Sequence, residues 1–427
     1  MNEYTVGLAF VNFLFCLWRT RSSMRNRRLI TACWFVISYL SFFAIFLAMG
    51  GPFKQYRGFT GDYVYIKDDT IFICIVYMLV FNMAFAAAES LTWRVFSPQK
   101  INTFAWSLPK GDSISEISRV IFGLILTASV VLYGIKMHGL GYRGYVEYQE
   151  SDWSVVFFWA SSPFITFSAM RKKYLQAFLG TIPFLYFAFT LHIRSFALAS
   201  IIPVALIVFF QTFTGPNAKV RRKSIIVGAA FLSVLIVISS VIMYLKTGRA
   251  DLPDSGLPYG MAITFQKTIE LNKYTGWNSL HLYLINILKP VYKLFYKLFG
   301  IDLPDIVDTP TYIAWLVDGV PLTSKIFFHY PTTWYSDAFV SFGYAGILLG
   351  LLWGVVLSLM ELVMSRSAHF FGLFLPYYAW HAYMLCRGAT AIAAVPISYP
   401  FYISAAIFFF ASLFVHRPPV KYRYENT

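Results

Sequence analysis

Three arginines stand at the edges of long apolar segments, where a positive charge is costly to place. Arg194 lies in LHIRSF between two such segments, Arg387 follows a third in CRGAT, and Arg249 lies in LKTGRADLP just beyond another. An arginine at the centre of a membrane span costs about 2.5–3.5 kcal/mol on insertion scales, and less near the edge. Because guanidinium groups form paired hydrogen bonds with phosphate, we expect these residues to bind an anion of the phosphate type. The alternative is that their side chains only extend to lipid headgroups.

A second group of candidate residues precedes a late apolar segment, in FFHYPTTWYSDAFVSFGYAGILLG. His329 and Asp337 can each take up a proton, so either could act as a general base. A lone histidine among aromatic residues is more often structural, and this alternative stays open. Gly343, Gly346 and Gly350 follow, and small residues at this spacing predict close packing of helices.

The apolar segments disfavour ion-coupled and nucleotide-driven chemistry. No segment has a carboxylate at its centre, although Asp337 and Glu361 stand near the ends of one, and no glycine-rich nucleotide loop is present. The cysteines show no metal-ligand spacing and are expected to pack in the interior; they are Cys16, Cys33, Cys74 and Cys386. We therefore expect no metal and no cofactor.

Long apolar stretches must position these residues. The chain is 58% hydrophobic and 13% charged, whereas soluble domains have about 25% charged residues. Stretches of roughly 17–25 apolar residues are long enough to cross a bilayer as helix. We place about 11 spans, at residues 4–18, 29–49, 70–88, 117–137, 153–170, 174–191, 196–213, 224–245, 337–363, 370–386 and 397–415. The expected fold is an all-α polytopic integral membrane protein, with residues 1–427 in a single domain.

The basic residues lie on one side of this arrangement. The loops on that side, together with Glu361 at the end of its span, carry the whole net charge of +15, and the other side is neutral. Cytoplasmic loops are enriched in Lys and Arg, so we expect an N-terminus outside the cytoplasm, a cytoplasmic C-terminus and no nucleic-acid partner. No cleavable signal peptide is expected, because arginines follow the first apolar run instead of preceding it. The basic segments are 19–28, 89–119, 171–173, 214–223, 364–369 and 416–427.

One long polar segment, residues 246–336, lies on the neutral, extracytoplasmic side between the eighth and ninth predicted spans. Within it, VYKLFYKLF (291–299) has the pattern of an amphipathic helix, with apolar residues opposite the lysines. Such a helix is expected in the membrane interface, and the alternative is a helix packed on the protein's own surface. The lysines that would reach the lipid headgroups are Lys289, Lys293 and Lys297.

The chain resembles the Wzy-type polymerases of O-antigen and exopolysaccharide repeat units and, more distantly, the O-antigen ligases. The matching features are Arg194 in IRS, the long outer loop before a late span, the run Asp337-x-Phe339-x-x-Phe342-Gly343-x-x-Gly346, and the pair Arg387-Gly388. The topology matches over essentially the whole chain, whereas the motifs cover a few dozen residues. In the ligases a histidine precedes the glycine pair at a shorter spacing than His329 does here, which favours the polymerases.

This resemblance implies glycosyl transfer between oligosaccharides linked to undecaprenyl diphosphate, on the periplasmic side of the bacterial inner membrane. A chain-length regulator protein and membrane lipids are the other partners that it implies. A flippase for lipid-linked oligosaccharides is the non-enzymatic alternative, although short outer loops and polar residues inside the spans would be expected of one. A glycosyltransferase of the GT-C type is a further alternative, for which Asp68 and Asp69 in the first outer loop would be the candidate acids.

Overall fold

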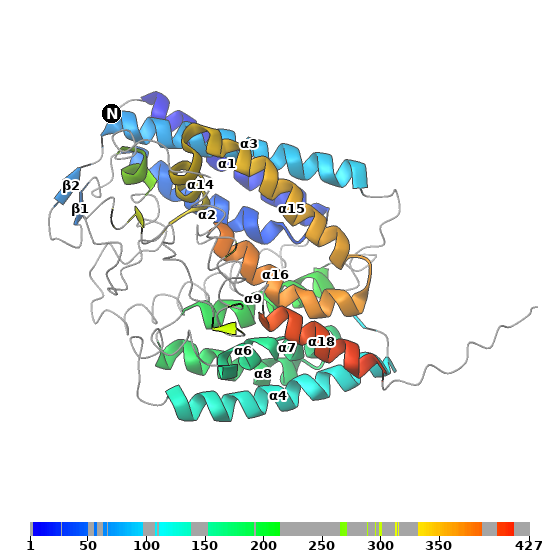
Figure 1. The fold of residues 1–427 in the computed structure, drawn as a ribbon. Helices are drawn as coiled ribbons and strands as arrows, with labels where there is room; N and C mark the ends of the chain where they lie inside the picture. Colours follow the sequence, from blue (N-terminus) through cyan, green and yellow to red (C-terminus); the bar gives the residue numbers. More distant parts are fainter. Residues whose placement is uncertain are drawn as a thin grey trace, which may run out of the picture. The chain divides into compact units, whose positions relative to one another are not determined.

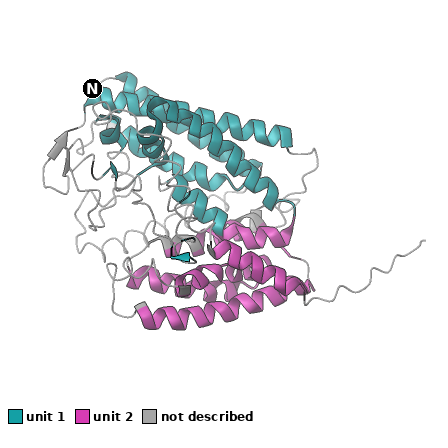
Figure 2. Ribbon diagram, viewed as in Figure 1, with its two compact units in different colours: residues 1–104, 213–366, 377–398 teal, residues 105–212, 367–376, 399–427 magenta. Residues whose placement is uncertain are grey.

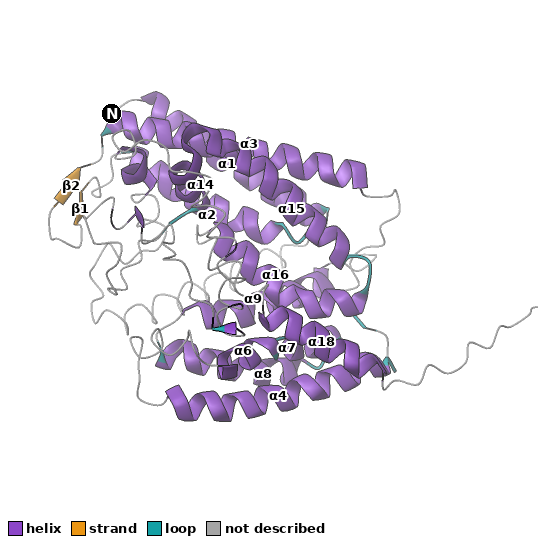
Figure 3. Cartoon of the chain, in the orientation of Figure 1, coloured by secondary structure: helices purple, strands orange, loops and turns teal. Residues whose placement is uncertain are grey.

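The structure of the chain is a computed structural model. It describes residues 3–26, 28–49, 55–57, 63–65, 67–96, 107–108, 111–137, 153–191, 194–213, 265–270, 288, 295, 299–300, 312–313, 315, 332–386 and 399–413. In this part the chain is nearly all helix (Figure 3), and the exception is a short antiparallel hairpin. Strand β1 (Gln55–Arg57) pairs with β2 (Tyr63–Tyr65), with Tyr56 opposite Val64.

The helices fall into two compact units (Figure 2). Unit 1 contains α1 (Glu3–Arg25), α2 (Thr31–Ala48), α3 (Asp68–Phe96), α14 (Trp334–Phe342), the 3₁₀ helix η2 (Gly343–Ile347) and α15 (Leu348–Met364). Unit 2 contains α4 (Ser113–Met137), α6 (Trp153–Ala160), α7 (Pro163–Met170), α8 (Tyr174–Thr190), α9 (Arg194–Phe213) and α18 (Tyr399–Leu413). Helix α16 (Ala368–Cys386) contributes residues up to Pro376 to unit 2 and the rest to unit 1.

Helix α3 is the helix that the other helices of unit 1 share. It packs against α1, α2, α14 and α15, and it lies alongside α15 in Figure 1. On α15 and η2, Gly346, Gly350 and Gly354 recur every four residues and face α3. A Cβ on Gly350 would lie 2.7 Å from the carbonyl oxygen of Phe81, and a Cβ on Gly354 would lie 2.6 Å from that of Phe85. The close packing predicted at Gly346 and Gly350 is therefore confirmed, and Gly354 extends it by one turn.

An aromatic cluster forms the core of unit 2. Phe158 is fully buried, and its ring centroid lies 4.3 Å from that of Phe184 and 5.2 Å from that of Phe187. The ring of Phe196, on α9, packs against the same cluster, 5.8 Å from Phe158. Helices that share a core of large rings bury much apolar area, and this burial stabilises the unit.

Two predicted spans are not continuous helices. The span predicted over 337–363 begins at Trp334, ends its first helix at Phe342, and restarts after η2; Gly343 has a φ of +57°, a value that favours glycine. The span predicted over 153–170 is interrupted at Ser161 and Ser162, after which Pro163 opens α7. A hydropathy profile does not show such breaks, because one or two serine, glycine or proline residues hardly change the mean hydropathy of a segment of span length.

Membrane-spanning character is supported by three helical segments of the described residues. Asp68–Phe96, Ser113–Lys136 and Trp334–Met364 are each long and apolar enough to cross a membrane, which indicates a membrane protein. On α8 the exposed apolar residues recur at helical spacing, as on a surface that contacts lipid. They are Leu175, Phe178, Leu179, Ile182 and Tyr186. The total of about 11 spans stays a prediction, and the span predicted over 224–245 lies outside the described residues.

Little of the predicted interfacial helix before Gly300 is described. Phe295 and Phe299 are helical and exposed, and their rings stack with centroids 5.8 Å apart. Gly300 has a φ of +65°, which agrees with its predicted place at the end of this helix. Lys289, Lys293 and Lys297 lie outside the described residues.

Adding a methyl group at Gly350 or Gly354 should destabilise unit 1. The new Cβ would meet a backbone oxygen of α3, so α15 has to move away, and overpacking of this kind costs about 1–3 kcal/mol. All four cysteines are buried and free, so a thiol-reactive fluorescent probe reports the unfolding of purified protein on heating. We expect Gly350→Ala and Gly354→Ala each to lower the unfolding midpoint.

The matched control is Gly7→Ala on α1, where an added Cβ meets nothing within 4 Å. Alanine favours helix over glycine by about 1 kcal/mol, so this variant should melt at or above the wild-type temperature. Equal melting of Gly350→Ala and the wild type would contradict the close contact between α15 and α3.

Candidate functional site

Of the predicted site residues, Asp337 alone has a described side chain. It lies in the first turn of α14, in unit 1, and is 2% exposed. Arg194 is the first residue of α9 in unit 2, and its side chain is not described. His329, Arg249 and Arg387 lie outside the described residues. Because only one of these side chains lies in the described part of the chain, the diphosphate site and the general base stay predictions.

The buried position of Asp337 follows from the way α14 begins. The side chain of Thr333 accepts a hydrogen bond from the Ser336 amide at 3.2 Å, and the Ser336 hydroxyl accepts one from the Thr333 amide at 2.8 Å. This capping box fixes the helix start one residue before Trp334. The amino end of a helix carries partial positive charge, which favours a carboxylate in the first turn. The local sequence thus places Asp337 where an acid is electrostatically supported.

A chain of buried polar side chains connects α14 to three other helices of unit 1. The Tyr335 hydroxyl donates to Oδ1 of Asn82 at 2.7 Å, and Nδ2 of Asn82 donates to Oδ1 of Asn12 at 3.1 Å. Nδ2 of Asn12 then donates to the hydroxyl of Ser41 at 3.2 Å. Within apolar helices such side-chain hydrogen bonds hold neighbours together. The sequence does not reveal this series of hydrogen bonds, because its four residues belong to four different helices.

The motif Asp337-x-Phe339-x-x-Phe342-Gly343-x-x-Gly346 forms one folded element on α3. The ring of Phe339 meets that of Tyr77 edge-on, with centroids 5.5 Å apart. The Tyr77 hydroxyl donates to the carbonyl oxygen of Gly343 at 3.4 Å, and Gly346 faces both this hydroxyl and the backbone of Ala338. The motif residues therefore hold the break between α14 and α15 in a fixed position.

A buried ion-pair cluster lies near the end of α1. Arg19 donates to Oε2 of Glu89 at 2.6 Å, and Arg28 donates to Oε1 at 2.8 Å. Nε1 of Trp34 donates to Oε2 of the same carboxylate at 3.2 Å. Glu89 is fully buried, so it is matched by two positive charges and a third donor, as a buried carboxylate requires.

The predicted loops around this cluster need correction. Residues 19–28 and 89–119 were expected as loops, but α1 runs to Arg25, α3 runs to Phe96 and α4 begins at Ser113. Charged residues ended the predicted spans too early, because hydropathy cannot show that Arg19 and Glu89 neutralise each other inside the protein.

Glu361 is the second fully buried carboxylate of unit 1. Its Oε2 accepts a hydrogen bond from the Leu29 amide at 3.1 Å, and its Oε1 accepts one from the Tyr378 hydroxyl. These contacts tie α15 to the start of α2 and to α16. Glu361 lies near the end of α15, as the sequence predicted.

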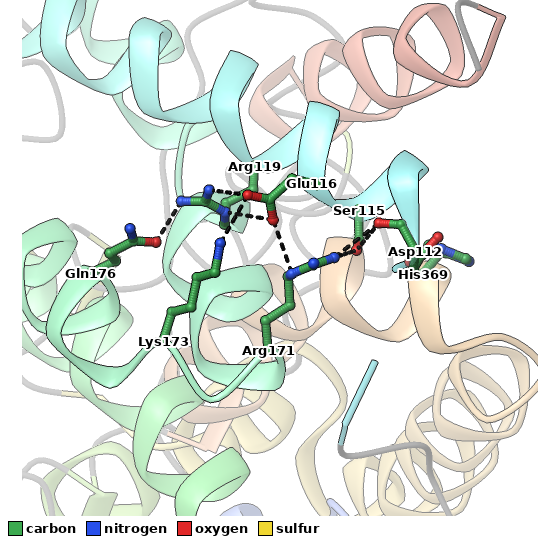
Figure 4. A network of polar contacts seen from close by, with 8 residues as sticks. All are labelled: Asp112, Ser115, Glu116, Arg119, Arg171, Lys173, Gln176 and His369. Atoms are coloured by element: carbon green, nitrogen blue, oxygen red, sulfur yellow. Dashed lines mark hydrogen bonds and ion pairs between the residues drawn. The ribbon is translucent and has the colours of Figure 1, made fainter. Parts of the chain in front are cut away.

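A second network of charges lies in unit 2, around the start of α4 (Figure 4). Glu116 pairs with Arg119, with Nε of Arg171 at 2.9 Å and with Nζ of Lys173 at 2.8 Å. Arg171 also donates to the hydroxyl of Ser115 at 2.6 Å. The turn between α7 and α8 is thereby fixed to α4, although Lys172 within it has the rare φ of +59°.

Asp112 extends this network to α16. Nε2 of His369 lies 2.6 Å from Oδ2 of Asp112, and the Asp112 carbonyl oxygen accepts a hydrogen bond from Arg171 at 2.9 Å. Figure 4 shows Asp112 between Ser115 and His369. The first half of α16 is therefore joined to the start of α4 within unit 2.

The chain matches no protein-family model, no curated protein and no solved structure. Among the described residues no group of three His, Cys, Asp or Glu side chains is arranged to hold a metal ion. The polar side chains that contact one another inside the described helices are mainly carboxylates, asparagine amides and arginine guanidinium groups.

Both ion-pair networks were missed by the sequence reading. The arginines and lysines of the predicted loops 19–28 and 171–173 indicated the topology, and no partner was assigned to them. One signal was available, because Glu89, Asp112 and Glu116 are among the few acids predicted on the basic side. Acids on that side are natural partners for the arginines.

Replacing Glu89 by glutamine should strongly destabilise unit 1. The amide keeps the shape but leaves two guanidinium groups without their counter-charge, and breaking a buried pair costs about 3–5 kcal/mol. The thiol-probe melting measurement should therefore show a large drop in the midpoint. Glu3→Gln is the matched control, because Glu3 is exposed in the first turn of α1. A Glu89→Gln midpoint equal to that of Glu3→Gln would show that the pairs contribute nothing.

Proposed function

We propose that the chain polymerises oligosaccharide repeat units linked to undecaprenyl diphosphate into a surface polysaccharide, an O-antigen or exopolysaccharide. The observation that carries this proposal is the folded element formed by Asp337, Phe339, Gly343 and Gly346 on α3. Phe339, Gly343 and Gly346 all contact Tyr77 of α3, and a motif whose residues share one partner is more specific than a chance match of apolar letters. It supports the resemblance that suggested the activity.

The proposed topology has about 11 spans in the bacterial inner membrane, with a periplasmic N-terminus and a cytoplasmic C-terminus. Support comes from the agreement between predicted spans and observed helices, such as 174–191 and Tyr174–Thr190, or 29–49 and Thr31–Ala48. In this topology residues 246–336 and the start of α14 lie on the periplasmic side, where lipid-linked repeat units are joined.

The proposed reaction transfers the growing glycan from its lipid diphosphate to a sugar hydroxyl of the next lipid-linked unit. Negative charge develops on the leaving diphosphate, and preorganised arginines stabilise such charge. Arg194, Arg387 and Arg249 are proposed for this role. His329 or Asp337 is proposed to accept the proton of the attacking hydroxyl. The energy comes from the donor's own glycosyl–diphosphate bond, so no nucleotide is consumed.

The interfacial helix is proposed to seat the polyprenyl lipid. Phe295 and Phe299 present two exposed, stacked rings on successive turns, and an exposed apolar face of this kind suits the acyl region of a membrane. Lys289, Lys293 and Lys297 would then reach the lipid phosphates.

A flippase for lipid-linked oligosaccharides is the second candidate, and one observation favours it. The sequence reading disfavoured a flippase because the spans lacked polar residues, whereas the structure has Asn12, Asn82, Glu89 and Glu361 fully buried within helices. Buried polar groups in membrane helices often mark substrate pathways. Here Asn12 and Asn82 bond to each other, Glu89 bonds to Arg19 of α1, and Glu361 bonds to the Leu29 amide just before α2. Bonds of this kind between helices fit a structural role as well.

Purified protein given only lipid-linked repeat units separates the two candidates. A polymerase produces a ladder of lengthened lipid-linked products without added nucleotide. A flippase, reconstituted in vesicles, moves the units across the bilayer and leaves their length unchanged. Transport without any ladder would overturn the proposed activity.

Arg194→Ala and Arg387→Ala should each abolish the ladder and leave single-unit lipid-linked product. Removing one charge-assisted donor from a developing oxyanion costs about 10²–10³ in rate. The matched control is Arg143→Ala, an arginine of another predicted outer loop that no motif singles out. Normal chain length in either test variant, with Arg143→Ala also normal, would contradict the diphosphate assignment.

A further inference from the structure

Three buried polar atoms at the arginine-rich end of unit 1 have no hydrogen-bond partner in the described part of the chain. They are Nε of Arg19, the hydroxyl of Ser23 and Nε1 of Trp93. Their residues are 8%, 1% and 8% exposed. Buried polar groups are nearly always paired, so each unpaired group calls for a bound partner.

The three residues lie on α1 and α3 within one helical turn of the same ion pair, Arg19–Glu89. Ser23 follows Arg19 by one turn on α1, and Trp93 follows Glu89 by one turn on α3. Arg19 and Glu89 are in direct contact, and α1 packs on α3. The guanidinium carbon of Arg28, the other partner of Glu89, lies 4.8 Å from the Trp93 ring centroid.

The chemistry of these atoms defines the missing partner. Arginine and tryptophan nitrogens can only donate hydrogen bonds, and a serine hydroxyl can donate as well. Glu89 cannot serve all of them, because both of its oxygens already accept bonds from Arg19, Arg28 and Trp34. The partner must therefore be rich in acceptors.

The local charge favours an anion over a neutral acceptor. Arg19 and Arg28 share the single carboxylate of Glu89, so these three side chains together carry net positive charge. Arg21 and Arg25 are exposed on the same stretch of α1 and form no ion pair with any described residue. A phosphate-type oxyanion supplies several acceptors and negative charge in one group.

We infer that this end of unit 1 binds a phosphate-type oxyanion through Nε of Arg19, the Ser23 hydroxyl and Nε1 of Trp93. The group is either the headgroup of an anionic phospholipid or free phosphate, since both present the same oxygens. The site differs from the proposed diphosphate site, whose arginines belong to other segments and to the opposite predicted side of the membrane. It does not depend on the proposed function.

Two variants remove one donor each and leave the Glu89 pairs intact. Trp93→Phe keeps an aromatic ring near Arg28 and removes the indole N–H together with the five-membered ring that carries it, and Ser23→Ala removes the hydroxyl. Trp18→Phe is the matched control. The Trp18 ring also lies near Arg19, with its centroid 5.6 Å from the guanidinium carbon, as does that of Trp34. Trp18 is 59% exposed, however, so its N–H is not one of the buried unpaired donors. None of the hydrogen bonds to Glu89 is removed, so all three variants should fold.

The test follows the unfolding midpoint of the full-length protein in neutral detergent, using the thiol probe. Inorganic phosphate is titrated at constant ionic strength, and phosphatidylglycerol is titrated against phosphatidylcholine in a separate series. We expect a saturable rise in the midpoint with phosphate or with phosphatidylglycerol. In Trp93→Phe and Ser23→Ala the half-effect concentration should rise about tenfold, as for one lost hydrogen bond to a charged group, and Trp18→Phe should behave like the wild type.

A response to inorganic phosphate identifies a free anion, and a response to phosphatidylglycerol alone identifies a headgroup. No saturable response to either, or an equal response in the wild type and both test variants, would overturn the site. Native mass spectrometry of the wild type gives an answer without any variant. Retained phosphate or phosphatidylglycerol supports the site, and a protein that retains neither argues that water fills it.

Discussion

Glu89 is fully buried among α1, α2 and α3, and a carboxylate enclosed in this way has to be matched by positive charge and hydrogen-bond donors. Arg19 reaches it from α1, Trp34 reaches it from α2, and Arg28 reaches it from the turn between them. The first three helices of the chain are thereby held together at one end. Within lipid no water can replace these partners, so the arrangement of unit 1 depends on this one carboxylate.

Helix α3 carries this constraint to the proposed site. Glu89 lies toward one end, Asn82 binds Tyr335 two turns earlier, and Tyr77 contacts Phe339 and Gly343 a turn before that. Between them, the carbonyls of Phe81 and Phe85 meet the glycines of α15. A rigid helix fixed at its far end is a suitable support for Asp337, because catalytic groups need second-layer contacts that lock their position.

Much of the helical content could be predicted from the sequence, and the contacts could not. Apolar runs such as 174–191 end within a residue of the observed helix, because the length of a span follows directly from hydropathy. The breaks at Gly343 and at Ser161 were missed, because they depend on single residues. The pairing of Arg19 with Glu89 joins residues far apart in the chain; the sequence shows that Glu89 is one of few acids on the predicted basic side, but not which arginine it contacts. Asp337 was found from its motif, but its capping box with Thr333 and Ser336 was not recognised.

The central claim is that the chain crosses the membrane with the arginine-bearing turns on the cytoplasmic side and residues 246–336 on the other. Labelling of single engineered cysteines by a membrane-impermeant thiol reagent tests this most directly, because the four native cysteines are buried. Lys172→Cys lies in the exposed turn between α7 and α8, and Ser255→Cys lies in the long polar segment. The account predicts that right-side-out vesicles label only Ser255→Cys and that inverted vesicles label only Lys172→Cys. Labelling of both residues from the same side would contradict it.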